Sequence, residues 1–140
     1  MGNGGSGATA SHFVCDFNKG ISEKLDSKYR FICLNDNIPT MLAYANDVSY
    51  NSIFVEQLKN LATEGDLVIG ISGSGNSNNV ISAIEYANAQ GCKTFGLVGY
   101  DGGMLKKIAQ NCIHIKINNM QIVEDIHMII DHLLYSVLSS

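Results

Sequence analysis

Two glycine- and serine-rich segments have residue types suited to binding a phosphate group. The segment ISGSGNSNNV offers three hydroxyl groups within six residues, at Ser72, Ser74 and Ser77. Gly73 and Gly75 let the backbone come close to a ligand and expose its N–H groups. A helical pattern follows, so a helix N-terminus adds free donors and a favourable dipole. No lysine follows the glycines as in a Walker loop, and the pattern therefore predicts a phosphate-monoester site. The alternative is a polar turn that only caps the helix.

The second segment, GNGGSG at residues 2–7, matches the G-x-G-x-x-G pattern of dinucleotide-binding folds. In that interpretation Asp36, which follows the apolar run FICLN, would be the acidic residue that binds the ribose. The pattern alone is weak, and the interpretation gives the serine-rich segment no purpose. A nucleotide-dependent enzyme therefore remains only a distant alternative.

Ionisable side chains recur at helical spacing in two places. His12 and Asp16 are four residues apart, and a C-terminal apolar helix carries a second group, namely Glu124, His127, Asp131 and His132. Polar groups in so apolar a setting need partners. A histidine and a carboxylate from each helix could act as general acid and general base. They could also bind a divalent metal such as zinc, and the two uses are compatible. His114 alternates with apolar residues in a strand and is interpreted as structural.

Strand-like and helix-like patterns alternate along the chain. Strands are predicted at 30–35, 65–72, 93–99 and 112–117, and helices at 7–18, 38–47, 51–62, 77–91, 102–110 and 120–138. This alternation predicts an α/β fold, a doubly wound parallel sheet with helices on both faces in a single domain spanning 1–140. In such sheets ligands bind beyond the carboxyl ends of the strands, where both glycine-rich loops would lie.

Composition narrows the possible partners. The 140 residues are 46% hydrophobic and 16% charged, with a formal net charge of −4, so neither nucleic acid nor an anionic membrane is an expected partner. No apolar run approaches the roughly 20 residues of a membrane-spanning helix. Cysteines occur at positions 15, 33, 92 and 112 without a paired spacing, which favours reduced, mostly buried thiols in a cytoplasmic protein.

Four motifs together resemble the sugar isomerase (SIS) domain, and most closely the phosphoheptose isomerases. They are GNGGSxxxxxHF, GDLVIGISGSGNSNNV, GLVGYDGG and EDIHMIIDHLL, and the segment AYANDVSYNSIF adds to the likeness. The resemblance runs from residue 2 to about residue 138. It implies a three-layer αβα fold in which a helix and a first strand precede GNGGS, so the protein is expected to carry about 40–50 further residues on the N-terminal side.

The resemblance also implies an activity. Enzymes of this family interconvert sedoheptulose 7-phosphate and D-glycero-D-manno-heptose 7-phosphate through an enediol, supplying heptose for lipopolysaccharide, capsule or other surface glycans. The family base corresponds to Asp16 and the acid to His132, and the family zinc site to His12, Asp16, Glu124 and His132. No nucleotide cofactor is implied. A homotetramer with sites at subunit interfaces is expected.

Substrate-binding positions carry over in the same way. The phosphate-binding serines correspond to Ser6, Ser72, Ser74 and Ser77, beside the loop glycines Gly4 and Gly73. Asn3, Asp47 and Glu124 fall on positions that contact the sugar.

Two departures from the family pattern affect the expected chemistry. The family glutamate is Asp16 here, one methylene shorter, and a base must come within about 3 Å of the atom that carries its proton. The family glutamine is Glu124 here, which adds a negative charge. The change at Asp16 favours an alternative function, a non-catalytic SIS module that binds a sugar phosphate or a protein partner. Convergence of His12, Asp16, Glu124 and His132 near the serine loops would favour an enzyme.

Overall fold

A three-stranded parallel sheet forms the centre of the computed structural model, which describes all 140 residues. Its strands β1 (Leu67–Ser72), β2 (Lys93–Val98) and β3 (Asn111–His114) lie side by side in sequence order. The N-terminal residues extend the sheet at the free edge of β1. Gly2 forms a parallel bridge with Ile71, and the Met1 amino group donates to the Ile69 carbonyl.

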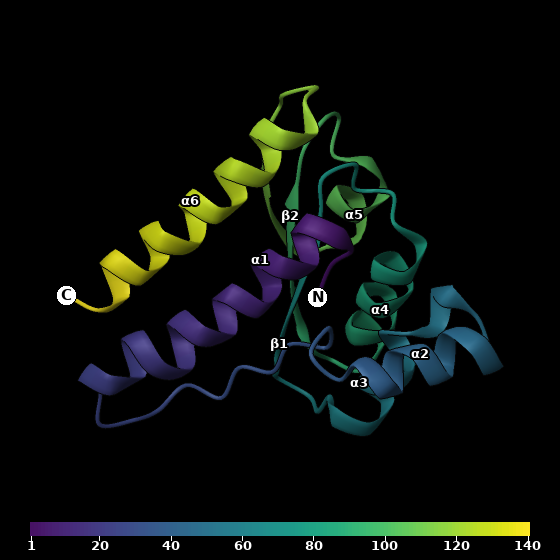
Figure 1. Cartoon of the computed structure of the whole chain (residues 1–140), viewed down its shortest axis with the longest axis horizontal. Coiled ribbons are helices and arrows are strands. Elements are labelled where there is room, and N and C mark those ends of the chain that lie inside the picture. Colours follow the sequence, from purple (N-terminus) through teal and green to yellow (C-terminus); the bar gives the residue numbers. More distant parts are fainter.

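Helices cover both faces of this sheet (Figure 1). Helix α1 (Gly4–Cys15) and the long α6 (Met120–Leu138) lie side by side on one face, while α4 (Asn78–Ala89) and α5 (Gly103–Ile108) cross the other. Helices α2 (Ile38–Asp47) and α3 (Val55–Leu61) pack on the α4 side. The predicted α/β class, a parallel sheet between two helical layers, is confirmed.

Each face of the sheet has its own apolar core, because alternate residues of a strand point to opposite faces. On the α4 side, Val68 and Val98 pack with Phe54, Val80 and Ile84. The core on the α1 and α6 side contains Phe13, Phe17, Ile71 and Leu97, with Ile130 and Leu134 packed against it. These cores fix how α1 lies against α6, and so position the residues that the two helices share.

The predicted strand at 30–35 is wrong. This segment is irregular, and its apolar side chains divide between the two cores, Cys33 on one side and Leu34 on the other. The side chain of Asn18 replaces a neighbouring strand, since its amide donates to the Phe31 carbonyl at 2.9 Å and accepts from the Phe31 N–H at 2.8 Å. Without a strand before Asp36, the dinucleotide interpretation loses the element on which it depended.

The other boundaries differ less. The first helix begins at Gly4 rather than residue 7 and continues from Asp16 to Ile21 as a π-helix, and a 3-10 turn follows at Ser22–Lys24. Strand β3 ends at His114, three residues early. Helix α6 has the predicted bounds, and the Asn119 side chain caps it by accepting from the Ile122 N–H.

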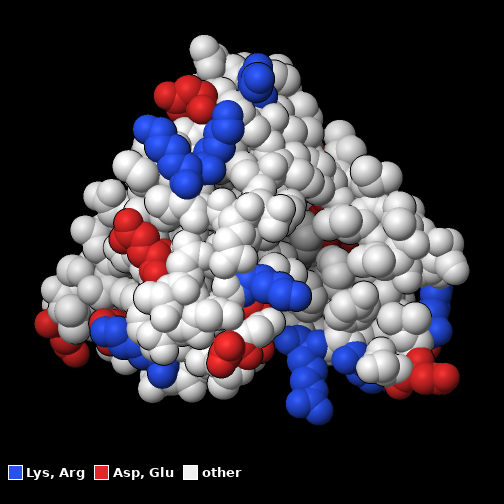
Figure 2. All heavy atoms as spheres, turned by 180° about the vertical axis from the view of Figure 1, so that it is seen from behind, with Lys and Arg blue, Asp and Glu red and all other residues white.

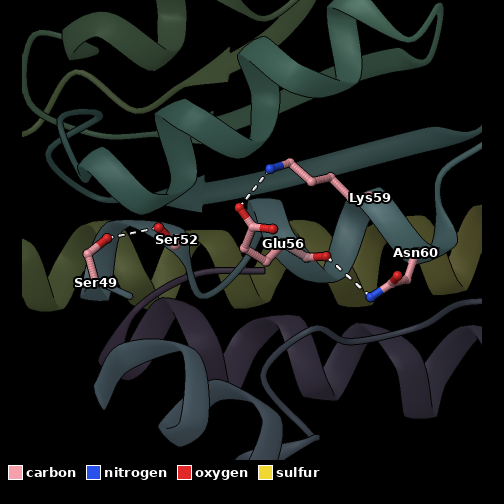
Figure 3. A network of polar contacts seen from close by, with 5 residues as sticks. All are labelled: Ser49, Ser52, Glu56, Lys59 and Asn60. Atoms are coloured by element: carbon pink, nitrogen blue, oxygen red, sulfur yellow. Dashed lines mark hydrogen bonds and ion pairs between the residues drawn. The ribbon is translucent and has the colours of Figure 1, made fainter. Parts of the chain in front are cut away.

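The predicted helix at 51–62 is divided into a 3-10 turn at Tyr50–Ser52 and the shorter α3. Figure 3 shows the polar contacts that hold these two pieces. The hydroxyl groups of Ser49 and Ser52 lie 2.8 Å apart across the turn, and Lys59 pairs with Glu56 at 2.7 Å on α3. The turn is thereby fixed in a conformation that carries Tyr50 outward, toward the N-terminal loop.

The surface matches the low charge of the sequence. On the face seen in Figure 2, acidic and basic side chains occur in small separate groups between wide uncharged areas. No helix is both long enough and apolar enough to cross a membrane. All four cysteines are free. Cys33 and Cys92 are buried as expected, but Cys15 is exposed on α1.

Candidate active site

The serine-rich loop folds tightly at the carboxyl end of β1. Ser72 is the last residue of the strand and is 3% exposed, and its hydroxyl lies 3.0 Å from that of Ser77 at the start of α4. The same hydroxyl accepts from the Gly75 N–H at 3.1 Å. Gly75 has a φ of +68°, and a Cβ there would collide with the Gly102 carbonyl. A serine-lined turn at a helix N-terminus results, as the sequence predicts.

The N-terminal loop joins this turn through a pair of amide side chains. Asn3 and Asn79 exchange hydrogen bonds of 3.0 and 2.8 Å, and Asn79 is 1% exposed. The Asn35 side chain holds Gly2 by donating to its carbonyl and accepting from its N–H. Ser6, 5% exposed, follows in the first turns of α1. The predicted phosphate-binding loops are therefore neighbours at one edge of the sheet.

Tyr50 also reaches this edge, where its hydroxyl donates to Asn3 Oδ1 at 3.0 Å. Asp47, expected to contact the sugar, lies three residues earlier at the end of α2, exposed and paired with the Asn46 amide at 2.7 Å. Asn35, Tyr50 and Asn79 are not among the site residues expected from the sequence motifs. Tyr50 and Asn79 lie inside the quoted motifs, but only the packing shows that both bind Asn3.

Two turns further along α1, the predicted catalytic residues meet. His12 Nε2 lies 3.1 Å from His132 Nε2 and 3.6 Å from a carboxylate oxygen of Asp16. The His12 side chain is 42% exposed and that of Asp16 is 19% exposed, so the group is open on one side. Asp16 begins the π-helical segment, a type of distortion that is frequent at functional sites.

Asp131 is the fourth residue of this group and approaches it from the buried side. Its ligand atom, together with one each from His12, Asp16 and His132, lies in a cluster no more than 4.8 Å across. Asp131 is fully buried, and neither of its carboxylate oxygens has a hydrogen-bond partner. Burial, reinforced by the negative charge of Asp16, raises the pKa of Asp131 to about 6, although His12 and His132 oppose the shift. We call His12, Asp16, Asp131 and His132 the α1/α6 cluster.

Glu124 lies elsewhere. Its carboxylate covers Gly5 in the first turn of α1, where the helix dipole favours a negative charge. Glu124 and His132 are eight positions apart in the sequence, which is about 12 Å along the helix. Within one chain, the structure therefore brings together three of the four residues expected to bind zinc and leaves Glu124 beside the N-terminal loop.

The α1/α6 cluster fits a divalent cation. Two imidazoles and two carboxylates are a donor set that zinc accepts, and metal–ligand distances of about 2.0–2.1 Å place two tetrahedral ligands about 3.3 Å apart. The distances of 3.1 and 3.6 Å from His12 Nε2 to its two neighbours bracket that value. The orphaned Asp131 carboxylate supplies the negative charge that such a cation requires.

A hollow of about 340 Å³ opens over the cluster, lined by His12, Asp16 and His132 together with Cys15, Tyr135 and Ser136. A larger hollow, about 620 Å³, lies at the edge of β1 and is lined mostly by apolar side chains such as Phe13, Phe31 and Leu58. The predicted acid and base both face the smaller hollow, which is the candidate reaction site.

Two further histidines lie outside the cluster. His127 is fully buried on α6 without a hydrogen-bond partner, and burial lowers its pKa. His114 Nε2 lies 2.9 Å from the Tyr100 carbonyl on β3, which agrees with the predicted structural role.

Comparison with known proteins identifies close relatives of the fold and of the sequence. Residues 1–99 match the family model described as the SIS domain. The chain is 39% identical over 134 residues to a probable phosphoheptose isomerase from Thermoplasma acidophilum, covering 96% of this chain and 73% of that protein. It is 36% identical over 137 residues to a phosphoheptose isomerase from Nitratiruptor, and the match covers 98% of this chain and 73% of that protein.

Solved structures give the same result. The phosphoheptose isomerase from Neisseria gonorrhoeae superposes with a TM-score of 0.90 at 26% identity, covering 99% of this chain and 73% of that one. A phosphoheptose isomerase from Francisella tularensis superposes with a TM-score of 0.91 at 27% identity. The match covers 99% of this chain and 74% of that one.

Proposed function

The chain belongs to the SIS domain family, in the group of the phosphoheptose isomerases, and on this premise we propose that it interconverts sedoheptulose 7-phosphate and D-glycero-D-manno-heptose 7-phosphate. One observation carries the proposal: His12, Asp16 and His132 meet in a hollow on the same helix pair whose N-terminal end adjoins the serine loop.

The distance between the serine loops and the α1/α6 cluster suits this substrate. Ser6 and His12 are six residues apart on α1, which is about 9 Å along the helix axis. An extended chain advances about 1.2 Å per bond, so the seven bonds from C2 of a heptulose 7-phosphate to its phosphorus span about 8 Å. With its phosphate between Ser6, Ser72, Ser74 and Ser77, the open-chain sugar would therefore place C1 and C2 beside the His12 ring, which lies 3.6 Å from the Asp16 carboxylate.

In this arrangement Asp16 is the base. Its carboxylate takes the proton from C1 of the ketose while the C2 carbonyl oxygen becomes the second hydroxyl of the enediol. The same carboxylate then returns the proton to C2. His132 accepts the proton of the O1 hydroxyl as the C1 aldehyde forms, and supplies the proton that O2 receives. Each proton removed is thus returned to the neighbouring carbon or oxygen.

The remaining residues bind and orient. The N–H groups around Gly4 and Gly73 and the serine hydroxyls hold the phosphate. Asn3 contacts the sugar hydroxyls, with Asp47 and Glu124 beside it. Zinc is the divalent cation that we propose for the site, with His12, Asp16 and His132 among its ligands. Such a cation supplies positive charge beside the substrate oxygens.

We place this reaction in the cytoplasm of a cell that makes heptose for lipopolysaccharide, capsule or other surface glycans. The active form we propose is a homotetramer with sites at subunit interfaces. An exposed apolar stripe on α6 supports this assembly, formed by Ile122, Ile129, Leu133 and Val137. The stripe passes next to His132, so a partner covering it would close the open side of the hollow.

Turnover of sedoheptulose 7-phosphate by the purified protein, followed by NMR, tests the proposal. We expect the heptose 7-phosphate to appear, and its formation to fall about 10²–10⁴-fold in Asp16→Asn, the range that general-base catalysis contributes. Asp26→Asn is the control, since this exposed carboxylate is distant in sequence from both loops. Absence of turnover, with sugar phosphates still raising the melting temperature, would indicate a binding module instead.

A further inference from the structure

The buried carboxylate of Asp131 has no role in the function described so far. It lies on the buried face of α6, in line with the fully buried Val123 and His127. An aliphatic residue would satisfy that environment, because a buried carboxylate without partners costs several kcal/mol of folding free energy. The presence of a carboxylate at this buried position therefore indicates that Asp131 binds another group.

No protein group meets this need. A buried carboxylate is stabilised by hydrogen-bond donors, by an opposite charge or by a metal ion. Both oxygens of Asp131 lack a hydrogen bond, and no lysine or arginine forms an ion pair with it. The polar groups that share the cluster with it are His12 from α1, Asp16 from the π-helical segment that continues α1, and His132 from its own helix.

The two residues of α6 approach the α1 pair from different sides. Asp131 is fully buried and reaches the cluster from the core, whereas the neighbouring His132 is exposed and reaches it from the solvent side. His12 on α1 and Asp16, four residues later at the start of the π-helical segment, complete the enclosure. Four donors from two helices thus surround one point.

We propose that Asp131 is the fourth protein ligand of a divalent-cation site formed with His12, Asp16 and His132, in the place that the family pattern gives to Glu124. This deepens the function proposed above, since it concerns the same site. It also accounts for both sequence departures together. Asp16 is one methylene shorter than the family residue, and a second carboxylate is available from α6. Glu124, about 12 Å away, is left free to face the sugar.

Cobalt(II) binding to the full-length, chelator-stripped protein tests this without any substrate. Four-coordinate cobalt absorbs visible light, so affinity and coordination can be measured by titration. We expect Asp131→Asn to weaken binding by more than the roughly 10–100-fold typical of an outer-shell change, and Glu124→Gln and the control Asp26→Asn to bind as the wild type does. Circular dichroism of the metal-free variants checks that each is folded.

A second variant tests direct contact. In Asp131→Cys, a thiolate replaces the carboxylate, and a sulfur-to-cobalt charge-transfer band should appear that the wild type lacks. Wild-type affinity in Asp131→Asn, no new band in Asp131→Cys, or loss of binding in Glu124→Gln alone would each overturn the assignment. Isomerase turnover is measured separately, so an active enzyme with an unimportant Asp131 and a metal-binding protein without turnover are distinguishable.

Discussion

At the scale of single residues, the distance between two carboxylates and two imidazoles decides what this site can do. His12 Nε2 and His132 Nε2 lie 3.1 Å apart, a distance that suits a hydrogen bond between them or two ligands of one metal ion. Asp131 is held in the core beneath them with no donor of its own. The metal-free protein therefore buries a carboxylate that has no hydrogen-bond partner, and the effect of this burial on stability can be measured.

Asp131 should make the metal-free protein less stable as the pH rises. Its pKa is about 6 in the folded state, above the 3.8 of the free side chain, so between pH 4 and 6 the folded protein holds the extra proton. The free energy of unfolding then falls with increasing pH through this window, and the cost is complete above it. Asp131→Asn removes this titration. The free energy of unfolding of Asp131→Asn, relative to that of the wild type, should therefore increase by about 2 kcal/mol between pH 4 and pH 7.5.

Urea unfolding in the presence of a chelator at pH 4, 6 and 7.5 measures this difference. Asp26→Asn is the control, because it also removes one carboxylate but from an exposed position. Its stability difference from the wild type should not change with pH. A stability difference between Asp131→Asn and wild type that does not change with pH would contradict the assigned titration.

At the scale of elements, the site depends on how loops and helices meet at the end of β1. The backbone of Gly75 lies against that of Gly102 and Gly103, so the serine turn and the loop after β2 support each other. The Asn3–Asn79 pair ties the N-terminal loop to α4. A change in any of these contacts should alter phosphate binding without touching the α1/α6 cluster.

Gly75→Ala should be far more damaging than Gly65→Ala. Both glycines have positive φ, +68° and +89°, so both substitutions strain the backbone by about 1 kcal/mol. Only at Gly75 would the new Cβ also meet backbone atoms, while Gly65 faces open space. We expect a total loss of about 2–4 kcal/mol for Gly75→Ala and the loss of thermal protection by sugar phosphates. Equal losses of stability in calorimetry would show that the turn is not packed as described.

Much of this element structure could be predicted from the sequence. The long apolar pattern of residues 120–138 predicts helix α6 with its observed bounds. Strands β1 and β2 follow from their continuous apolar runs. Residues 30–35 could not be predicted, because the amide of Asn18, distant in sequence, satisfies the backbone that a strand partner would otherwise bind.

For the site, motif resemblance identifies His12, Asp16 and His132, and the structure brings them together. It gives Glu124 as the fourth member, whereas the structure places Asp131 beside these three residues. That choice depends on how α1 lies along α6, which the packing of the shared core determines rather than any local pattern.

At the scale of the whole molecule, the two ends of the site set the length of the substrate. The serine loops and the α1/α6 cluster are separated by about 9 Å of α1, which matches a seven-carbon chain. Fructose 6-phosphate and ribulose 5-phosphate are shorter by about 1.2 and 2.4 Å. We expect kcat/KM to fall at each step from sedoheptulose 7-phosphate, by 10²-fold or more where the misplacement reaches 1 Å. Equal kcat/KM values for the three ketoses would show that the phosphate does not bind at the serine loops.

Assembly is the second property of the whole molecule. Leu133→Glu places a charge in the centre of the apolar stripe on α6, where the side chain is 59% exposed. We expect light scattering to show a smaller particle than wild type and turnover to fall with it, because the hollow loses its cover. Leu42→Glu makes the same change at a 62% exposed leucine of α2, on the other side of the fold, and should leave both unchanged. A tetramer that survives Leu133→Glu would exclude this stripe as the interface.

The measurement that tests the central claim most directly is isomerisation of sedoheptulose 7-phosphate in D₂O. If Asp16 carries the proton through an enediol, the heptose 7-phosphate will contain deuterium at C2, because a protonated carboxylate exchanges its proton rapidly with water. The same product should form at least about 10²-fold more slowly in Asp16→Asn. Heptose formed without deuterium, or at an unchanged rate in the variant, would contradict the assignment of Asp16 as the base.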